Sequence, residues 1–386
     1  MMETQSTGAG RFANFDLSRV PTPCFVVDEI AIERNLKILQ ALSQSSGADI
    51  LLALKAFSMW SLAPLLNQYL AGTCASGLWE AQLARAHYGG KLASFAPAFA
   101  ANEIDEIARL SDHLVFNSVP QIGRFEAAAR AGNADIGLRL NPEHSEGDIE
   151  KYDPCAPGSR LGQPISQLGD EKLEAVQGFH MHTLCEQGLA PLARTLEAVL
   201  PFLRDRKGSF SWLNLGGGHL VTRPGYDVSG LSDLLRKTGD ELGVQTYLEL
   251  GTSVAFDAGI LVGEVLDVVH NQGPIAILNV SATCHMPDVI EAPYRPALLG
   301  EAATGQAVKL GGPSCLAGDV IGDYHFDELP KAGQRVAFLD QAHYSMVKTS
   351  TFNGIALPSI AIWNSQTDAL RMVRQFSYAD FEGRLS

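Results

Sequence analysis

Eight short apolar runs, rich in β-branched and aliphatic residues, recur through the first two thirds of the chain. The starts of the first five lie 21 or 22 residues apart, which is room for a strand, a loop and a short helix. The runs are Ile50–Leu54, Ala71–Cys74, Leu92–Phe95, Leu114–Phe116, Ile136–Leu140, Gly178–Met181, Trp212–Leu215 and Thr246–Glu249. The segments between them are rich in helix-forming residues. Eight alternating strand and helix units favour a (β/α)8 TIM barrel over an open doubly wound sheet.

The pattern changes after Gly251 into runs separated by Gly, Pro and Asn turns, which indicates a β domain. Those runs are Leu261–His270, Ile275–Val280, Arg335–Leu339 and Ala361–Asn364. Thr22–Val27 also has the composition of a strand. We therefore expect a barrel over 29–260 and a C-terminal β domain over 261–386 that the N-terminal strand 20–28 joins. The stretch 144–162, rich in Gly, Pro, Ser and charge, predicts a long loop, of a length that is usually either functional or disordered.

Composition limits the partners of the chain. Its 386 residues are 46% hydrophobic and 19% charged, enough apolar surface for two folded domains. The formal net charge is −14, so we expect no nucleic-acid partner. No apolar run is long enough to span a membrane. Six cysteines without C-x-x-C spacing are interpreted as reduced thiols in a cytoplasmic protein.

The active site of a TIM barrel lies at the C-terminal ends of its strands, so the residues just after each run are candidates. They are Lys55, Ser76, Asn117, Arg139, His180, His182, Gly216, Gly217, Gly218 and Glu249. A lysine at the end of an apolar strand is costly to desolvate, which lowers the pKa of the ammonium and favours Schiff-base chemistry. Three consecutive glycines let backbone N–H groups approach a phosphate.

Each of these residues also has an ordinary explanation when taken alone. Lys55 could be a lysine that extends its ammonium into solvent, and the glycines could form a tight turn. Glu249 could pair with Arg139, and His180 could be a half-buried histidine with satisfied hydrogen bonds. His180 and His182 could also bind a metal, but no cysteine or carboxylate is placed to complete a clear ligand set, so we expect none. Together, the lysine, glycines, flat histidine and carboxylate match the requirements of pyridoxal phosphate.

With these residues in place, the sequence resembles the fold-type III pyridoxal-phosphate decarboxylases, relatives of ornithine and diaminopimelate decarboxylase with an alanine racemase-like barrel. Within them it is most similar to the carboxynorspermidine/carboxyspermidine decarboxylases. The similarity covers nearly the whole chain. The motifs that carry it include Ala53-Leu-Lys-Ala, Leu138-Arg-Leu-Asn-Pro, Asn214-Leu-Gly-Gly-Gly, His285-Met-Pro-Asp, Gly312-Pro-Ser-Cys-Leu-Ala-Gly-Asp and Tyr344-Ser-Met-Val-Lys.

The resemblance implies an enzyme that decarboxylates carboxynorspermidine or carboxyspermidine in polyamine biosynthesis. It implies that Lys55 forms the Schiff base, His180 stacks on the cofactor ring and Glu249 pairs with the ring nitrogen. Further cofactor contacts that it implies are Ser76, Arg139, Gly216 to Gly218 and Tyr344. It also implies a head-to-tail homodimer with shared sites. In such a dimer the partner's Cys315 would donate a proton after CO2 leaves, and the partner's Asp319 would face the substrate amine. Asp288 would be a further substrate contact.

The chain departs from the family pattern after the eighth run. Where the family usually has Glu-Pro-Gly-Glu, this chain has Glu249-Leu-Gly-Thr252, so a second carboxylate is replaced by Thr252 at a substrate-binding position. The departure leaves open a decarboxylase of the same fold that acts on another amino acid or carboxylated amine. A racemase would need a base opposite Lys55, typically a tyrosine. A non-catalytic pyridoxal-phosphate carrier remains the alternative from another class, although such carriers lack a β domain.

Overall fold

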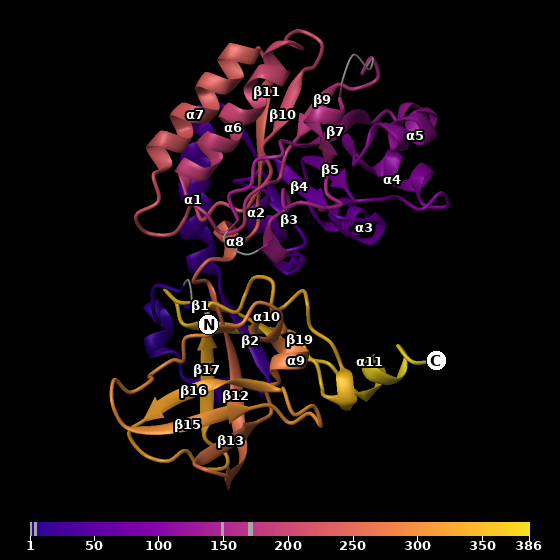
Figure 1. The fold of residues 1–386 in the computed structure, drawn as a ribbon. Helices are drawn as coiled ribbons and strands as arrows, with labels where there is room; N and C mark the ends of the chain where they lie inside the picture. The colour runs from indigo at the N-terminus through magenta and orange to yellow at the C-terminus, as the bar shows by residue number, and fades with distance from the viewer. Residues whose placement is uncertain (1, 4–5, 148–149, 169–172) are drawn as a thin grey trace. The chain divides into compact units, whose positions relative to one another are not determined.

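The computed structural model describes the chain except residues 1, 4–5, 148–149 and 169–172. The chain divides into two compact units, one of residues 34–254 and one of residues 1–33 with 255–386. The first, called here the barrel unit, is a closed parallel barrel, and the second, the sheet unit, is built mainly on antiparallel strands (Figure 1). Within the described ranges no helix has the length and apolar character needed to cross a membrane.

Eight parallel strands form the barrel and coincide with the eight apolar runs of the sequence, which confirms the predicted (β/α)8 fold. They are β3 (Asp49–Ala53), β4 (Gly72–Ala75), β5 (Lys91–Phe95), β6 (His113–Phe116), β7 (Asp135–Asn141), β9 (Gly178–His180), β10 (Trp212–Asn214) and β11 (Gln245–Leu250). The last strand closes on the first, with Leu248 of β11 opposite Ile50 of β3. Nearly every residue of these strands is buried, as expected for a parallel sheet covered on both faces.

Helices cover the outside of the barrel (Figure 1). They are α1 (Glu29–Ser46), α2 (Ala63–Leu66), α3 (Leu78–His87), α4 (Ile104–Leu110), α5 (Val119–Ala131), α6 (Leu189–Arg204), α7 (Val228–Leu242) and α8 (Thr252–Ala255). In α6, Leu192, Leu196, Val199 and Leu203 are buried at the three- and four-residue spacing of one helix face. Between β7 and β9 the described residues form β8 (Gln163–Pro164) and the 3-10 turns η4 (Glu150–Tyr152) and η5 (Ile165–Gln167), with no α-helix.

The N-terminal end of the barrel is filled by Trp212, the first residue of β10. A Cβ at Gly178 would lie 1.9 Å from the Trp212 indole, and one at Gly137 would lie 2.5 Å from it. His113 stacks on the same indole, with ring centroids 4.3 Å apart and an interplanar angle of 3°. This packing fills the N-terminal end of the barrel. The C-terminal strand ends are therefore the end at which a site can form.

The sheet unit takes its strands from both ends of the chain. They are β2 (Cys24–Asp28), β12 (Gly259–His270), β13 (Pro274–Leu278), β15 (Gln306–Gly311), β16 (Val320–Phe326), β17 (Arg335–Leu339), β18 (Ser359–Asn364) and β19 (Ala369–Arg374). The strands follow the order β16-β15-β13-β12-β2-β18-β19, and β17 also pairs with β12. The smaller elements are β1 (Met2–Glu3), β14 (Tyr294–Arg295), α9 (Ala282–His285), α10 (Asp288–Glu291) and α11 (Tyr378–Glu382).

The N-terminal strand β2 lies inside this sheet. It pairs antiparallel with β12 and parallel with β18. Phe25 packs into one hydrophobic cluster, with Leu261 and Phe338, while Val26 packs into a second. Because successive side chains of a strand point to opposite faces, β2 contributes to the cores on both sides of the sheet.

Candidate active site

Three ionisable side chains meet at the C-terminal ends of the barrel strands. His180 ends β9, Glu249 lies near the end of β11, and His182 follows β9 by two residues. His180 Nε2 lies 3.4 Å from Glu249 Oε2, and His182 Nδ1 lies 3.8 Å from the same oxygen. Three of the residues that the strand-end argument selected from the sequence therefore lie together in the structure.

The carboxylate of Glu249 is buried, with 7% of the residue exposed. Asn214 Nδ2, at the end of β10, donates to Glu249 Oε1 at 2.8 Å. Burial alone would raise the pKa of Glu249, but its interactions with the His180 and His182 rings outweigh burial and hold that pKa well below its usual value. Glu249 is therefore an ionised, buried acceptor at neutral pH.

His180 is a neutral imidazole at neutral pH. Burial lowers its pKa, and Glu249 offsets only part of that shift. Because an ionised Glu249 accepts from Nε2, the other ring nitrogen, Nδ1, carries the lone pair. Nδ1 is buried and has no hydrogen-bond partner among the described residues. The ring of His180 also stacks on Phe95, with centroids 5.4 Å apart and an interplanar angle of 30°.

Arg139 lies beside this group on β7. Its Nη2 donates to the backbone oxygen of His182 at 2.8 Å, and its guanidinium lies 4.5 Å from the centroid of the Phe95 ring. Burial lowers the pKa of Arg139 to about 10, so it stays cationic at neutral pH. Among the described ion pairs, those of Glu249 are with the two histidines, so the simple Arg139 pair considered from the sequence is not formed.

The glycines after β10 form a turn that no larger residue fits. Gly216 and Gly218 have φ values of +68° and +86°, which favour glycine. A Cβ at Gly217 would lie 2.1 Å from the backbone oxygen of Glu249, and one at Gly218 would lie 2.1 Å from that of Leu184. The backbone N–H of Gly217 donates to His182 Nδ1 at 3.2 Å. The turn thus presents no side chains, and its backbone packs directly against β11, the strand that carries Glu249.

Lys55 stands in a turn just beyond β3 and is exposed. The sequence argument expected the Lys55 side chain to be desolvated at its strand end. In the single chain it is exposed instead, because the turn places it beyond the buried part of β3. Its positive charge still reaches the site, since it contributes to lowering the pKa values of His180 and His182. Lys55 thus belongs to the same group of residues.

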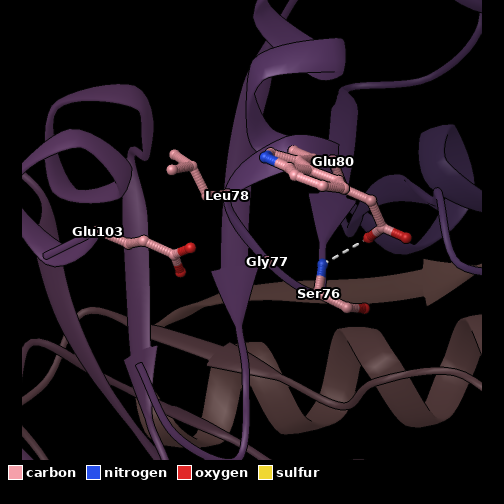
Figure 2. A pocket seen from close by; sticks show the side chains of 6 residues that line it. Ser76, Gly77, Leu78, Glu80 and Glu103 are labelled. Carbon is pink, nitrogen blue, oxygen red and sulfur yellow. Dashed lines mark hydrogen bonds between the residues drawn. The ribbon is translucent and has the colours of Figure 1, made fainter. Parts of the chain in front are cut away.

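Ser76 follows β4 and lines an open pocket of about 390 Å³ together with Gly77, Leu78, Trp79, Glu80 and Glu103. Figure 2 shows the backbone N–H of Ser76 donating to Glu80, at 2.6 Å. The hydrogen bond satisfies a backbone group next to the start of α3, so Glu80 has a structural role there. Thr252 begins α8, two residues after the end of β11, and is partly exposed.

His180, His182 and Glu249 also satisfy the distance requirement for a three-residue metal site, with ligand atoms within 4.8 Å of one another. However, His182 Nδ1 already accepts the N–H of Gly217, so the lone pair that a cation would use is engaged. Burial, with a smaller effect of Lys55, lowers the pKa of His182 to about 3, which keeps the imidazole neutral in that acceptor role.

The remaining sequence candidates lie in the sheet unit. Asp288 forms an ion pair with Lys348 at 2.6 Å. Cys315 is exposed, and its backbone N–H donates to Asn353 Oδ1 at 3.0 Å. Asp319 is buried and accepts several hydrogen bonds within the sheet unit. Tyr344 adopts a positive φ of 47° in the turn after β17. The structure describes each of these four residues within the sheet unit.

The barrel group is defined here as Lys55, Arg139, His180, His182, Glu249 and the glycine turn. Sequence reasoning missed two polar residues of the barrel unit, Asn214 and Thr183. Asn214 is fully buried and holds both Glu249 and the N–H of Gly216. Its signal was a polar residue at the end of an apolar strand, the criterion already applied to the other strands. Thr183 has a buried hydroxyl without a partner among the described residues. A lone threonine in a loop carries no sequence signal for such a role.

These features fit pyridoxal phosphate. The cofactor presents a protonated ring nitrogen, a phosphate and an aldehyde that reacts with an amine. The buried Glu249 carboxylate suits the ring nitrogen, and the glycine turn, which carries no side chains, suits a phosphate approached by backbone. The N–H groups of Gly216 and Gly217 bind Asn214 and His182, so the N–H of Gly218 is the donor of the turn that the described hydrogen bonds leave for it. The orphaned Thr183 hydroxyl offers a further donor. Lys55 provides an accessible amine at the same end of the barrel.

Comparison with known proteins gives matches over nearly the whole chain. A family described as "Pyridoxal-dependent decarboxylase, C-terminal sheet domain" matches residues 24–342. A carboxynorspermidine/carboxyspermidine decarboxylase of Campylobacter jejuni is 39% identical over 95% of this chain and 99% of its own length. A carboxyaminopropylagmatine decarboxylase of Synechocystis is 38% identical, with 96% of each chain covered.

Solved structures agree with these matches. The crystal structure of carboxynorspermidine decarboxylase from Campylobacter jejuni, complexed with norspermidine, is 37% identical. It superposes with a TM-score of 0.87 over 95% of this chain and all of that one. Diaminopimelate decarboxylase from Helicobacter pylori, complexed with L-lysine, gives a TM-score of 0.83 at 18% identity, over 95% of this chain and 98% of that one. The second likeness bears on the fold alone.

Proposed function

This chain belongs to the pyridoxal-dependent decarboxylase family, and we propose that it converts carboxynorspermidine or carboxyspermidine to norspermidine or spermidine. It is a decarboxylase that uses pyridoxal phosphate. The observation that carries the choice of substrate is the 37% identity, over nearly the full length, to a decarboxylase whose crystal structure holds norspermidine. We assign the reaction to the site formed by Lys55, His180 and Glu249.

The cofactor supplies an electron sink for the bond pair left behind when CO2 departs. In our proposal Lys55 Nζ would be the amine that holds the cofactor covalently. Glu249 keeps the ring nitrogen protonated, because a buried carboxylate is a strong acceptor for that N–H. His180 packs against the ring as a neutral imidazole. The phosphate is bound by the backbone of the glycine turn, and Ser76, Arg139 and Tyr344 are the remaining cofactor contacts.

We further propose that the enzyme is a homodimer whose sites are shared. The partner subunit's Cys315 completes each site and gives a proton from Sγ to the carbon that has lost CO2. The proposal is supported by the exposure of Cys315 in the single chain and by the state of Cys74, the thiol beside Glu249, whose pKa burial raises well above its usual value. Asp288 and Thr252 are proposed as substrate contacts. A cytoplasmic location is supported by the free state of all six cysteines.

The proton-donor role of Cys315 is tested by Cys315→Ser. We expect the variant to bind the cofactor normally, because its barrel residues are intact, but to turn over at least tenfold more slowly and with some misdirected protonation. Cofactor absorbance, rate and product ratio should be measured together, with Cys24→Ser in β2 as the control for losing a thiol. An unchanged rate and a single product would exclude the role.

A second substrate is favoured by a specific observation. The carboxyaminopropylagmatine decarboxylase of Synechocystis is as similar to this chain as the Campylobacter enzyme, at 38% against 39% identity. The name of its substrate denotes an agmatine tail, which ends in a guanidinium instead of an ammonium. Thr252 removes a carboxylate at a position implied to bind substrate, so the tail contacts need not follow the usual pattern.

The experiment is CO2 release from a substrate panel by the purified protein with pyridoxal phosphate. The panel contains carboxyspermidine, carboxynorspermidine, carboxyaminopropylagmatine, ornithine, lysine, arginine and diaminopimelate. We expect kcat/KM for a carboxylated polyamine to exceed that for each amino acid by at least a hundredfold. Preference for carboxyaminopropylagmatine would support the second candidate, whereas cofactor absorbance without turnover of any of them would refute both substrates while leaving the family unchanged.

A further inference from the structure

The loop that carries Cys315 connects the antiparallel strands β15 and β16. It is closed by backbone hydrogen bonds, from Gly312 N to Asp319 O at 2.8 Å and from Asp319 N to Leu316 O at 2.9 Å. The N–H of Cys315 donates to Asn353 Oδ1 at 3.0 Å. Asn353 has a φ of +59°. The segment that accepts the Cys315 N–H is therefore also a tight turn.

The carboxylate of Asp319 organises this loop from inside. The residue is 4% exposed. Ser281 Oγ lies 3.0 and 2.9 Å from its two oxygens, and the N–H groups of Thr283 and Ser314 donate to them at 3.1 and 3.2 Å. None of the described lysines and arginines forms an ion pair with it. The negative charge is therefore compensated by dipoles from α9 and from the Cys315 loop.

The surrounding packing leaves Asp319 little freedom. A Cβ at Gly312 would lie 2.3 Å from Asp319 Oδ2, so the loop begins with a glycine against the carboxylate. On the α9 side, Cys284 O accepts from Ser350 N at 2.8 Å, and Cys284 Sγ lies 3.5 Å from Phe352 O. Helix α9 thus connects the carboxylate to the segment that contains Asn353.

We infer that Asp319 is a positioning residue, which fixes the Cys315 loop against α9, and not a contact to the substrate amine. Both of its oxygens are occupied by donors of the protein, and a substrate ammonium would have to displace them. Loss of the carboxylate would deprive the part-buried N–H groups of Thr283 and Ser314 of this acceptor, which destabilises the loop. The inference rests on the proposed function for the role of Cys315 in protonation.

The first test measures the thiol directly and does not depend on turnover. The rate of iodoacetamide modification of Cys315 is followed by peptide mass spectrometry in the holoenzyme, with the exposed Cys185 of the barrel unit as internal reference. Asp319→Asn replaces one carboxylate oxygen, an acceptor, by an NH2 group. The hydrogens of that group would face the protein donors that now bind the oxygen. We expect the Cys315 to Cys185 rate ratio to rise at least threefold, because the loop is released. A ratio that stays unchanged or falls would overturn the inference.

Two further variants guard against a folding defect. Ser281→Ala removes one donor to the carboxylate and should raise the same ratio by a smaller factor, so it serves as the test should Asp319→Asn not fold. Asp323 lies on β16 with its side chain 69% exposed, in an ion pair with Lys309 at 3.1 Å. Asp323→Asn is the matched control and should leave the ratio unchanged.

The second test separates positioning from substrate contact. If Asp319 acts through Cys315, Asp319→Asn lowers kcat at least tenfold while KM stays within about threefold, and cofactor absorbance is unchanged. If it binds the substrate amine, KM rises tenfold or more with an unchanged thiol ratio, and the inference fails. Should the protein turn over none of the panel substrates, the proposed function fails, but the thiol ratio still decides on the loop.

Discussion

Glu249 combines burial, ionisation and a defined set of neighbours. Asn214 fixes one carboxylate oxygen and His180 faces the other. An amide at this position would keep the shape but lose the charge that holds a proton on the cofactor ring. We therefore expect Glu249→Gln to retain cofactor but to lower kcat about a hundredfold, equivalent to roughly 2.7 kcal/mol of transition-state stabilisation. Steady-state kinetics measure this, with Glu126→Gln on the surface of α5 as control, and a kcat within twofold of the wild type would contradict it.

Lys55 is exposed in the chain, so its removal should cost little folding free energy. Its effect should instead be chemical, because no other residue of the barrel group offers an amine for covalent attachment. We expect Lys55→Ala to lose the visible absorbance of the bound cofactor and at least a thousandfold of turnover. Lys237→Ala, on the exposed face of α7, is the matched control. Spectra and rates of both variants decide the question, and a Lys55→Ala enzyme that keeps its absorbance would remove Lys55 from the proposal.

At the scale of elements, the glycine turn depends on the strand next to it. A Cβ at Gly217 would lie 2.1 Å from Glu249 O, so an added methyl must push the turn away from β11. Gly217→Ala is therefore expected to weaken cofactor binding at least tenfold, as measured by absorbance titration. Gly188→Ala, before α6, is the control, because a Cβ there meets nothing within 4 Å. Equal affinities of the two variants would show that the turn does not position the phosphate.

The elements differ in how well the sequence predicted them. The barrel strands were found because each is buried on both faces and reads as a continuous apolar run. Strands β15, β16 and β19 were missed, since exposed residues such as Lys309, Asp323 and Arg371 interrupt them. In the site, charged residues at strand ends were predicted, because burying them is costly without a function. Asn214 met the same strand-end criterion but was overlooked, whereas Thr183 lies in a loop, and its hydroxyl is buried only by neighbours that the fold brings close.

At the scale of the whole molecule, the path of the chain determines which parts can fold independently. The sheet unit needs β2 from the N-terminal end, because β2 lies between β12 and β18 and packs into hydrophobic clusters on both faces. The barrel unit is continuous from residue 34 to residue 254. The sheet unit therefore closes only after the barrel has been synthesised, and the two units are linked at two points of the chain.

Buried histidines in both units make stability depend on pH. Burial lowers the pKa values of His113 and His219 in the barrel unit, and of His285 in the sheet unit, to about 4. The unfolded chain binds protons at these histidines near pH 6.5, whereas the folded chain does so only near pH 4. Stability is therefore full above about pH 6.5 and is lost as the pH falls from there towards 4.

His219 tests this linkage most cleanly, because neither of its ring nitrogens has a hydrogen-bond partner among the described residues. Its contribution to the loss of unfolding free energy between pH 7 and pH 5 should be about 2 kcal/mol. His219→Leu removes the titrating group, so the loss measured by denaturant unfolding at the two pH values should shrink by that amount. The exposed His270→Leu variant should lose as much as the wild type. If His219→Leu also loses as much unfolding free energy as the wild type, the acid sensitivity does not come from burying this imidazole in its neutral form.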